Sequence, residues 1–94
     1  MIYKYVQYEV HQGYNTYIKE HLENFLRSIQ EHEPDSRYEA FEVEEGKYIH
    51  FMSFKDEIAE ELHKNADYTI LFVEKLYPKC VYQPKFYDMK PINY

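Results

Sequence analysis

The stretch from Lys47 to Leu76 changes its hydrophobic period partway along, and this change most constrains the fold. Residues 47–54 (KYIHFMSF) alternate between two faces, which is typical of a strand. From residue 58 onward, apolar residues recur at helical spacing. Asn65-Ala66-Asp67 interrupts that pattern, so we expect a broken helix with Asp67 capping its second segment. A strand must therefore lead directly into two short helical segments.

The remaining segments complete a recognisable order. The same criteria predict strands at residues 2–10, 37–44 and 81–88 and a helix at residues 14–31. Glu45-Gly46 separates two alternating segments, so strands 37–44 and 47–54 should form a hairpin. The order is that of an α+β, ferredoxin-like βαββαβ domain, with two helices on one face of a four-stranded antiparallel sheet. We expect residues 1–94 to form one such domain.

The apolar stripes predict which face of each helix packs against the sheet, and the residues at the helix ends predict the caps. In the first helix the stripe contains Tyr14, Ile18, Leu22, Phe25, Leu26 and Ile29. In the broken helix we expect Ile58 and Leu62 to point inward, followed by Tyr68, Leu71, Phe72 and Leu76. Asn15 or Thr16 is expected to cap the first helix, and Ser53 with Asp56 resembles a capping box for the second.

The strands carry aromatic or apolar residues on both faces. Strand 2–10 has Val6 and Tyr8 on one face and Tyr3 and Tyr5 on the other, and strand 47–54 shows the same two-sided pattern. A sheet that is apolar on both sides needs cover on both sides, and two helices cover only one. We therefore expect a twofold homodimer packed sheet against sheet. A monomer with exposed tyrosines is the alternative.

Charge and composition disfavour several classes of protein. The net charge is −6 and no basic run is present, so we expect no nucleic-acid partner. No apolar run approaches the roughly 20 residues of a membrane helix, and the N-terminus lacks the apolar core of a signal peptide. The single cysteine, Cys80, excludes an intramolecular disulfide. We therefore expect a cytoplasmic protein without a membrane partner.

Three short motifs carry a family resemblance. They are residues 33–39 (EPDSRYE), residues 52–57 (MSFKDE), and His63 followed by Asn65 and Tyr68. Together they resemble the antibiotic biosynthesis monooxygenase-like family of small, dimeric α/β-barrel proteins, and the resemblance covers most of the chain. The sequence departs from the family pattern at Asp35, where glycine is usual, and at Phe54, where tryptophan is usual.

The resemblance implies an activity as well as a dimeric α/β barrel. In that family the cavity lies between sheet and helices, and some members oxygenate phenolic or quinol substrates without metal or flavin. It therefore implies a monooxygenase that needs no cofactor and acts on a small aromatic or quinone-type substrate. The haem-degrading branch fits poorly, because the chain has no tryptophan and no histidine near position 72. A non-catalytic, ligand-binding or stress-related barrel protein and a structural interaction module are the alternatives.

Two histidines are the candidate catalytic residues. A cofactor-independent oxygenation needs a base, and a neutral histidine suits that role near pH 7. His63 is the predicted base, and His50, on the third strand, is predicted to act beside it as a pocket donor. The alternative is that each histidine is a hydrogen-bonded packing residue. His11, His21 and His32 are dispersed and no HExxH motif is present, so we predict no metal site.

The resemblance also suggests which residues surround a small aromatic ligand. The predicted substrate-binding residues are Tyr48, Met52, Asn65, Tyr68 and Phe72. Tyrosine and asparagine donors in this set would hold a developing oxyanion. We expect the mouth of the pocket at the helix break, residues 65–67.

Overall fold

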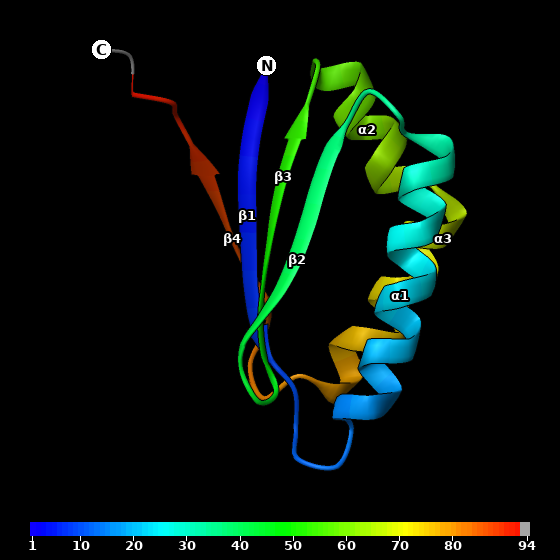
Figure 1. Cartoon of the computed structure of the whole chain (residues 1–94), viewed down its shortest axis with the longest axis vertical. Coiled ribbons are helices and arrows are strands. Elements are labelled where there is room, and N and C mark those ends of the chain that lie inside the picture. The colour runs from blue at the N-terminus through cyan, green and yellow to red at the C-terminus, as the bar shows by residue number, and fades with distance from the viewer. Residues whose placement is uncertain (93–94) are drawn as a thin grey trace.

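In the computed structural model, three helices cover one face of a four-stranded antiparallel sheet (Figure 1). The structure describes residues 1–92, so the last two residues of the predicted domain lie outside it. The strands run in the order β2-β3-β1-β4 across the sheet. This confirms the predicted ferredoxin-like fold, with the second helix divided into α2 and α3. The elements are β1 (Ile2–Glu9), α1 (Asn15–His32), β2 (Arg37–Glu44), β3 (Lys47–Phe54), α2 (Glu57–Asn65), α3 (Asp67–Leu76), a short 3-10 helix (Tyr77–Lys79) and β4 (Lys85–Met89).

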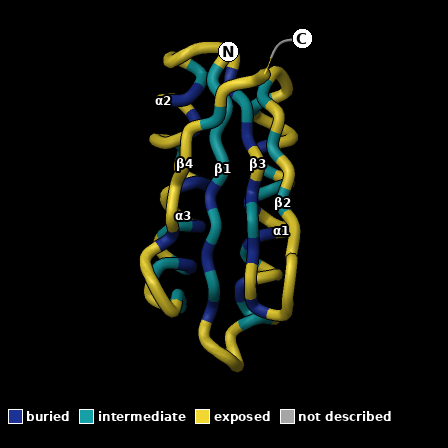
Figure 2. The backbone as a smooth tube through the Cα atoms, turned by 90° about the vertical axis from the view of Figure 1, so that its left-hand side faces the viewer, coloured by how far each residue is buried: buried dark blue, intermediate teal, exposed yellow. Residues whose placement is uncertain are grey.

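The core lies between the inner face of the sheet and the helices. Val6 and Tyr8 of β1 pair with His50 and Tyr48 of β3, and all four side chains are buried under the helices. Helix α1 supplies the opposing stripe of Ile18, Leu22, Phe25 and Ile29, as predicted. Leu26 is only partly buried, and Tyr14 precedes the helix and is 41% exposed, so it does not belong to the stripe. Figure 2 shows that burial concentrates in the central strands β1 and β3, while the edge strands β2 and β4 are more exposed.

The β2–β3 turn requires a glycine. Gly46 has a positive φ of 81°, a conformation that side chains other than glycine rarely adopt. The Val10 N–H donates to the Gly46 carbonyl over 2.9 Å, so the turn is held against the end of β1.

Helix α2 presents a different face to the sheet from the one predicted. Ile58 and Leu62 were expected to point inward, yet their side chains are 73% and 68% exposed. The buried residues of α2 are Glu60 and His63. Glu60 Oε2 lies 2.6 Å from Nζ of Lys4 on the inner face of β1, so an ion pair attaches α2 to the sheet. Each partner shifts the other's pKa, raising that of Lys4 and lowering that of Glu60.

The helix ends also differ from prediction. Asp56 is itself the N-cap of α2, where its carboxylate accepts from the Ala59 N–H over 2.9 Å, so it is not the second member of a capping box. Ala66 occupies the N-cap of α3, and Asp67 is the first helical residue. No side chain caps α1, because the Asn15 amide donates to Glu42 on β2 instead. In α3, Leu71 is half exposed and Thr69 takes a buried position.

The last strand is shorter than the predicted residues 81–88. Strand β4 spans only Lys85–Met89, because the chain bends at residues 81–82 and Pro84 has no N–H to donate to the sheet. Cys80 forms an isolated antiparallel bridge with Val10 ahead of the bend. Within residues 1–92, no helix is both long and apolar enough to cross a membrane.

Candidate functional site

Glu33, His63 and Tyr68 meet where α1 ends and α2 passes into α3. Nδ1 of His63 lies 2.9 Å from Oε2 of Glu33 and 3.2 Å from its Oε1, and the Tyr68 hydroxyl donates to Oε2 over 2.5 Å. The side chains of His63 and Glu33 are only 8% and 10% exposed. Desolvation first, and then the bond to Glu33, raise the pKa of Tyr68. A nearly buried carboxylate is thus held by two donors.

This contact fixes where His63 can exchange a proton. An ionised carboxylate only accepts hydrogen bonds, so Nδ1 of His63 carries the hydrogen that Glu33 accepts. In the neutral ring, Nε2 is then the nitrogen that takes up a proton. The aromatic rings of Phe54, Tyr38 and Phe25 surround His63, with ring centroids 5.1, 5.5 and 5.9 Å away. His63 is therefore oriented by Glu33 and lies beside an aromatic interior.

Glu33 was absent from the predicted site. It is the residue that follows α1, and its own N–H donates to the Ile29 carbonyl over 2.7 Å. A carboxylate at a helix C-terminus opposes the helix dipole, so it is locally unfavourable. That conflict is the signal in the sequence that could have indicated a partner elsewhere in the fold.

His50 lies between two tyrosines in the core. The Tyr8 hydroxyl lies 2.7 Å from Nε2 of His50, and the Tyr38 hydroxyl lies 2.8 Å from Nδ1. Burial lowers the pKa of His50 to about 3, so the ring is neutral near pH 7. Burial is also the main cause that raises the pKa of Tyr8 and of Tyr38. Both ring nitrogens are occupied, so His50 has no ring nitrogen left to receive a substrate proton.

The buried, neutral state of His50 predicts a pH dependence of stability. The unfolded ring has a pKa near 6.5 and the folded ring about 3, so between these values the unfolded chain binds one more proton. The free energy of unfolding should therefore fall by about 1.4 kcal/mol per pH unit as the pH decreases below 6.5. Urea unfolding at pH 7, 6 and 5 measures this slope.

A non-titrating variant isolates the contribution of His50 from those of the other histidines. His50→Gln keeps one donor and one acceptor but binds no proton. The slope of its unfolding free energy against pH should therefore be smaller by the contribution of about one bound proton. Equal slopes for the two proteins would contradict a neutral, buried His50.

Tyr48 belongs to a third network, at the other end of the sheet. Its hydroxyl donates to Oδ1 of Asn15, whose amide donates to Glu42. Glu42 also lies 2.9 Å from Nζ of Lys19 and accepts from the Gly46 N–H. The Lys19 contact is the main cause that lowers the pKa of Glu42 to about 2. Desolvation raises the pKa of Tyr48 to about 12. This network joins α1 to the β2–β3 hairpin.

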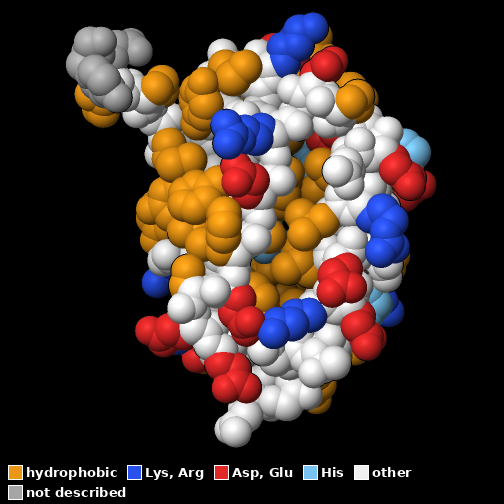
Figure 3. Space-filling view, in the orientation of Figure 1, with side chains coloured by type: hydrophobic (Ala, Val, Ile, Leu, Met, Phe, Trp, Pro, Cys, Tyr) orange, Lys and Arg blue, Asp and Glu red, His pale blue; other side chains and the backbone are white. Residues whose placement is uncertain are grey.

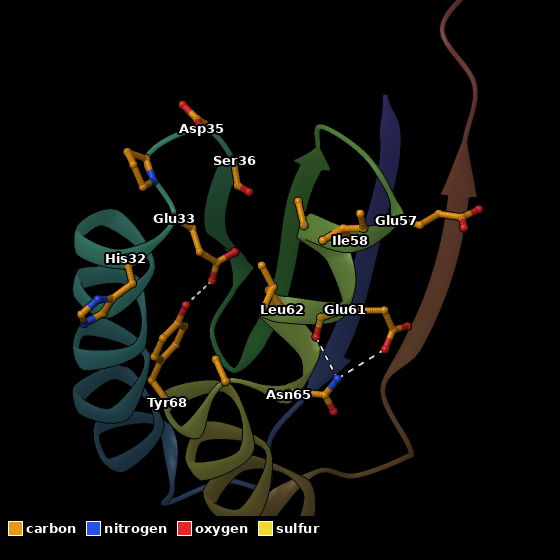
Figure 4. A pocket seen from close by; sticks show the side chains of 13 residues that line it. His32, Glu33, Asp35, Ser36, Glu57, Ile58, Glu61, Leu62, Asn65 and Tyr68 are labelled. Atoms are coloured by element: carbon orange, nitrogen blue, oxygen red, sulfur yellow. Dashed lines mark hydrogen bonds between the residues drawn. The ribbon is translucent and has the colours of Figure 1, made fainter.

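Three hollows border the Glu33 and His50 networks. The first, the loop groove, has a volume of about 890 Å³ and lies between the loop 33–36 and α2 (Figure 4). Figure 4 shows Glu33 and Tyr68 reaching toward one another at its wall and Leu62 within it. Asn65 also lines this groove, but its amide donates to the carbonyl and carboxylate of Glu61. The helix break therefore borders a groove outside the layer between sheet and helices, and it stays a prediction as the mouth of a substrate pocket.

The other two hollows open at the edges of the layer between sheet and helices. The β2-edge hollow, of about 480 Å³, lies between β2 and α1 and shares Glu33 with the loop groove; it is lined by Leu26, Ile29, Gln30, Glu33, Tyr38 and Ala40. Figure 3 shows apolar side chains recessed between the sheet and α1 on this side. The β4-edge cleft holds only about 70 Å³, and its lining includes Tyr8, Tyr38, His50, Met52, Thr69, Phe72 and Val73.

The predicted site residues are therefore divided between locations. His63 and Tyr68 meet at Glu33, and Asn65 lies in the adjoining loop groove. His50, Met52 and Phe72 line the β4-edge cleft instead. Tyr48 lines neither of these two hollows but a separate one of about 190 Å³, together with Lys19 and Glu42. Among residues 1–92, no cluster of three or more histidine, cysteine or acidic side chains is arranged to share a metal ion.

Comparison with solved structures places this geometry in a known fold. A crystal structure of an antibiotic biosynthesis monooxygenase superposes with a TM-score of 0.90 at 12% identity, covering 99% of this chain and 100% of that one. The chain has the antibiotic biosynthesis monooxygenase fold. Rv0793 from Mycobacterium tuberculosis matches this fold at a TM-score of 0.86 and 10% identity, over 99% of this chain and 96% of the other. A conserved protein from Methanosarcina mazei matches at a TM-score of 0.85 and 12% identity, over 95% of this chain and 90% of the other.

Comparison of the sequence alone does not reveal this relationship. No family model and no curated protein match it. A shared antibiotic biosynthesis monooxygenase fold at such low identity establishes architecture, and one fold can support unrelated activities. The function must therefore be argued from the side chains of this chain.

Proposed function

We propose that this protein is a cofactor-independent monooxygenase for a small aromatic or quinone-type substrate, with His63 as the general base. The observation that carries the proposal is the nearly buried Glu33–His63 pair, which holds the imidazole in one tautomer. The β2-edge hollow is the proposed substrate site. Glu33 and Tyr38 line that hollow and both adjoin His63, and its volume lies within the usual range for ligand sites.

The proposed chemistry begins with removal of a proton. Nε2 of His63 takes the phenolic proton, and Glu33 stabilises the resulting imidazolium through Nδ1–H. The substrate anion is electron-rich and reacts with dioxygen at a ring carbon. His63 returns the proton to the peroxide, which then loses water. One aromatic C–H carbon becomes a carbonyl, so the phenol and one dioxygen give a quinone and one water.

Oxygen uptake tests this proposal directly. Purified protein with EDTA and no added flavin should consume one dioxygen per substrate oxidised, with at least one member of a panel of quinols, naphthols and anthrones. Uptake is followed with an oxygen electrode and the products by mass spectrometry under labelled dioxygen. The proposal fails if every panel member is oxidised only at the rate measured without protein.

One observation favours a second candidate function, that of a non-catalytic ligand-binding barrel. Both ring nitrogens of His50 are occupied by tyrosines, and the cleft beside it, at about 70 Å³, is too small for an aromatic ring. A protein of this kind would bind the same panel in the β2-edge hollow without turnover. Saturable binding combined with absent oxygen uptake would select this alternative.

We also propose that the protein forms a homodimer through the outer face of the sheet. Four aromatic residues, one from each strand, form a continuous row there: Phe41, Phe51, Tyr5 and Tyr87. Neighbouring ring centroids in this row are 6.1, 6.0 and 4.8 Å apart. Figure 3 shows a broad hydrophobic area on the sheet side of the molecule. A twofold axis through the row would cover it with the same row of a second copy.

A charge in this aromatic row should dissociate the dimer. Sedimentation should give a mass of twice 11.6 kDa for the natural protein, and Phe51→Glu should sediment as a single chain. Burying an unpaired carboxylate costs about 2–5 kcal/mol, and a twofold interface contains two of them. Leu71→Glu is the matched control, because Leu71 is half exposed on the helical side, and it should stay dimeric. A single-chain mass for the natural protein would refute the dimer.

A further inference from the structure

The β4-edge cleft contains a buried hydroxyl without a partner. Thr69, in the first turn of α3, is 9% exposed, and its side chain lines the cleft. Among residues 1–92, its Oγ1 has no hydrogen-bond partner. Most buried polar atoms in proteins are paired, so this hydroxyl is available to donate a hydrogen bond to a ligand in the cleft.

A second donor borders the same cleft. A neutral imidazole has one N–H and one acceptor nitrogen, so only one of Tyr8 and Tyr38 can donate its hydrogen to His50. The other tyrosine accepts from the ring N–H, and its own O–H hydrogen has no acceptor within the described chain. Tyr8, Tyr38 and Thr69 all line the cleft. The cleft is therefore bordered by two spare O–H donors.

The size of the cleft limits its ligand to a few atoms. An apolar cavity that binds benzene has a volume of about 150 Å³, about twice the 70 Å³ of this cleft. Apart from these hydroxyls and His50, its lining is mainly apolar, with Phe25, Met52, Phe72 and Val73 among the residues. Such a space suits a small, weakly polar molecule that gains hydrogen bonds only when it acquires negative charge.

We propose that the β4-edge cleft is the dioxygen site, with the Thr69 hydroxyl and one tyrosine hydroxyl positioned to donate to the oxygen as it becomes negative. This inference rests on the proposed monooxygenase function. Phe25 and Tyr38 line the cleft, and the centroids of their rings lie 5.9 and 5.5 Å from that of His63. The cleft and the base therefore share these two aromatic neighbours.

The electron transfer follows from this placement. One electron passes from the substrate anion to dioxygen, giving a substrate radical and superoxide, whose charge the two hydroxyls stabilise. The radical and superoxide then combine to form the C–O bond of the peroxide, which takes the proton held by His63. Tyr38 borders both the cleft and the β2-edge hollow, so the two spaces adjoin at its side chain.

The first test requires no substrate. Dissolved dioxygen is paramagnetic, so under oxygen pressure it speeds the NMR relaxation of methyl groups near its binding site. The methyls of Met52, Val73 and Leu76, which line the cleft, should relax several-fold faster than that of Ile18, a fully buried core residue away from it. Val73→Phe should fill the cleft and abolish the difference. Equal enhancement at Ile18 and at the cleft methyls would overturn the proposal.

The second test isolates the hydroxyl. Thr69→Val keeps the volume of the side chain, so oxygen-induced relaxation should persist, while kcat/KM for dioxygen with the fastest panel quinol should fall about tenfold. Thr69→Ser should restore it, and Thr16→Val, at an exposed threonine of α1, should leave it unchanged. An unchanged kcat/KM in Thr69→Val would overturn the role of the hydroxyl.

The two proposals fail in different ways. Selective relaxation without any oxygen uptake would refute the monooxygenase function but leave the cleft as an oxygen site. Oxygen uptake without selective relaxation would refute the cleft while the function stands.

Discussion

Replacing His50 with leucine should lower the free energy of unfolding by about 2–5 kcal/mol, because it leaves the buried hydroxyls of Tyr8 and Tyr38 unpaired. Each unsatisfied buried polar group costs about 1–3 kcal/mol. Leucine has a similar volume, so the loss measures hydrogen bonding more than packing. A typical domain is stable by only about 5–15 kcal/mol, so the effect should be plain in urea unfolding at pH 7.

Two further variants separate hydrogen bonding from other causes. His50→Gln supplies one donor and one acceptor and should lose much less stability than His50→Leu. In the His50→Leu background, Tyr8→Phe removes one of the unpaired hydroxyls and should recover part of the loss. If His50→Leu unfolds at the same urea concentration as the natural protein, then the tyrosine–histidine contacts contribute no net stability.

The strands of the hairpin and β1 could be predicted because their evidence is local. Each strand shows alternation between two faces, and one glycine turn separates the two strands of the hairpin. The predicted strands at residues 37–44 and 47–54 have the observed bounds. The last strand was placed too early because its first residues carry strand-like side chains. Pro84 and the bend at residues 81–82 delay pairing, and the sequence pattern gives them too little weight.

The orientation of α2 could not be predicted from hydrophobicity. Ile58 and Leu62 formed the apparent inner stripe, but Glu60 and His63 occupy the buried positions. Their partners, Lys4 and Glu33, lie 56 and 30 residues away in the chain. A pattern within the helix contains no information about such partners, so a polar face that is buried through distant pairs looks like a solvated face.

The same reasoning explains what was found and missed at the site. His63 and Tyr68 were identified by resemblance, and the structure brings both to Glu33, which no local motif indicates. The pocket was expected as one space between sheet and helices. The structure instead has a hollow at each edge of that layer and a groove outside it, because the core aromatic residues fill the centre.

The proposed base predicts the largest effect on activity. His63→Ala should lower kcat for oxygen uptake by about 10²–10⁴-fold, the usual contribution of a general base. Added imidazole should restore part of the rate, because it can occupy the space and take the proton. A packing defect would not respond in this way. His21→Ala, at a partly buried position of α1 that lines none of the three hollows, is the matched control and should keep full activity.

Glu33→Gln distinguishes a positioning role from a catalytic one. Glutamine can still accept from Nδ1–H of His63 and from the Tyr68 hydroxyl, so the ring should keep its tautomer but lose stabilisation of the imidazolium. The expected loss is about 10–100-fold in kcat, which corresponds to the roughly 1.5–3 kcal/mol of a hydrogen bond to a charged group. It should be smaller than for His63→Ala, because the base itself remains. A larger loss than for His63→Ala, without rescue by imidazole, would mean that the Glu33 carboxylate takes the substrate proton. Because Glu33 borders the β2-edge hollow directly, that outcome would transfer the role of base to it and leave His63 as its support.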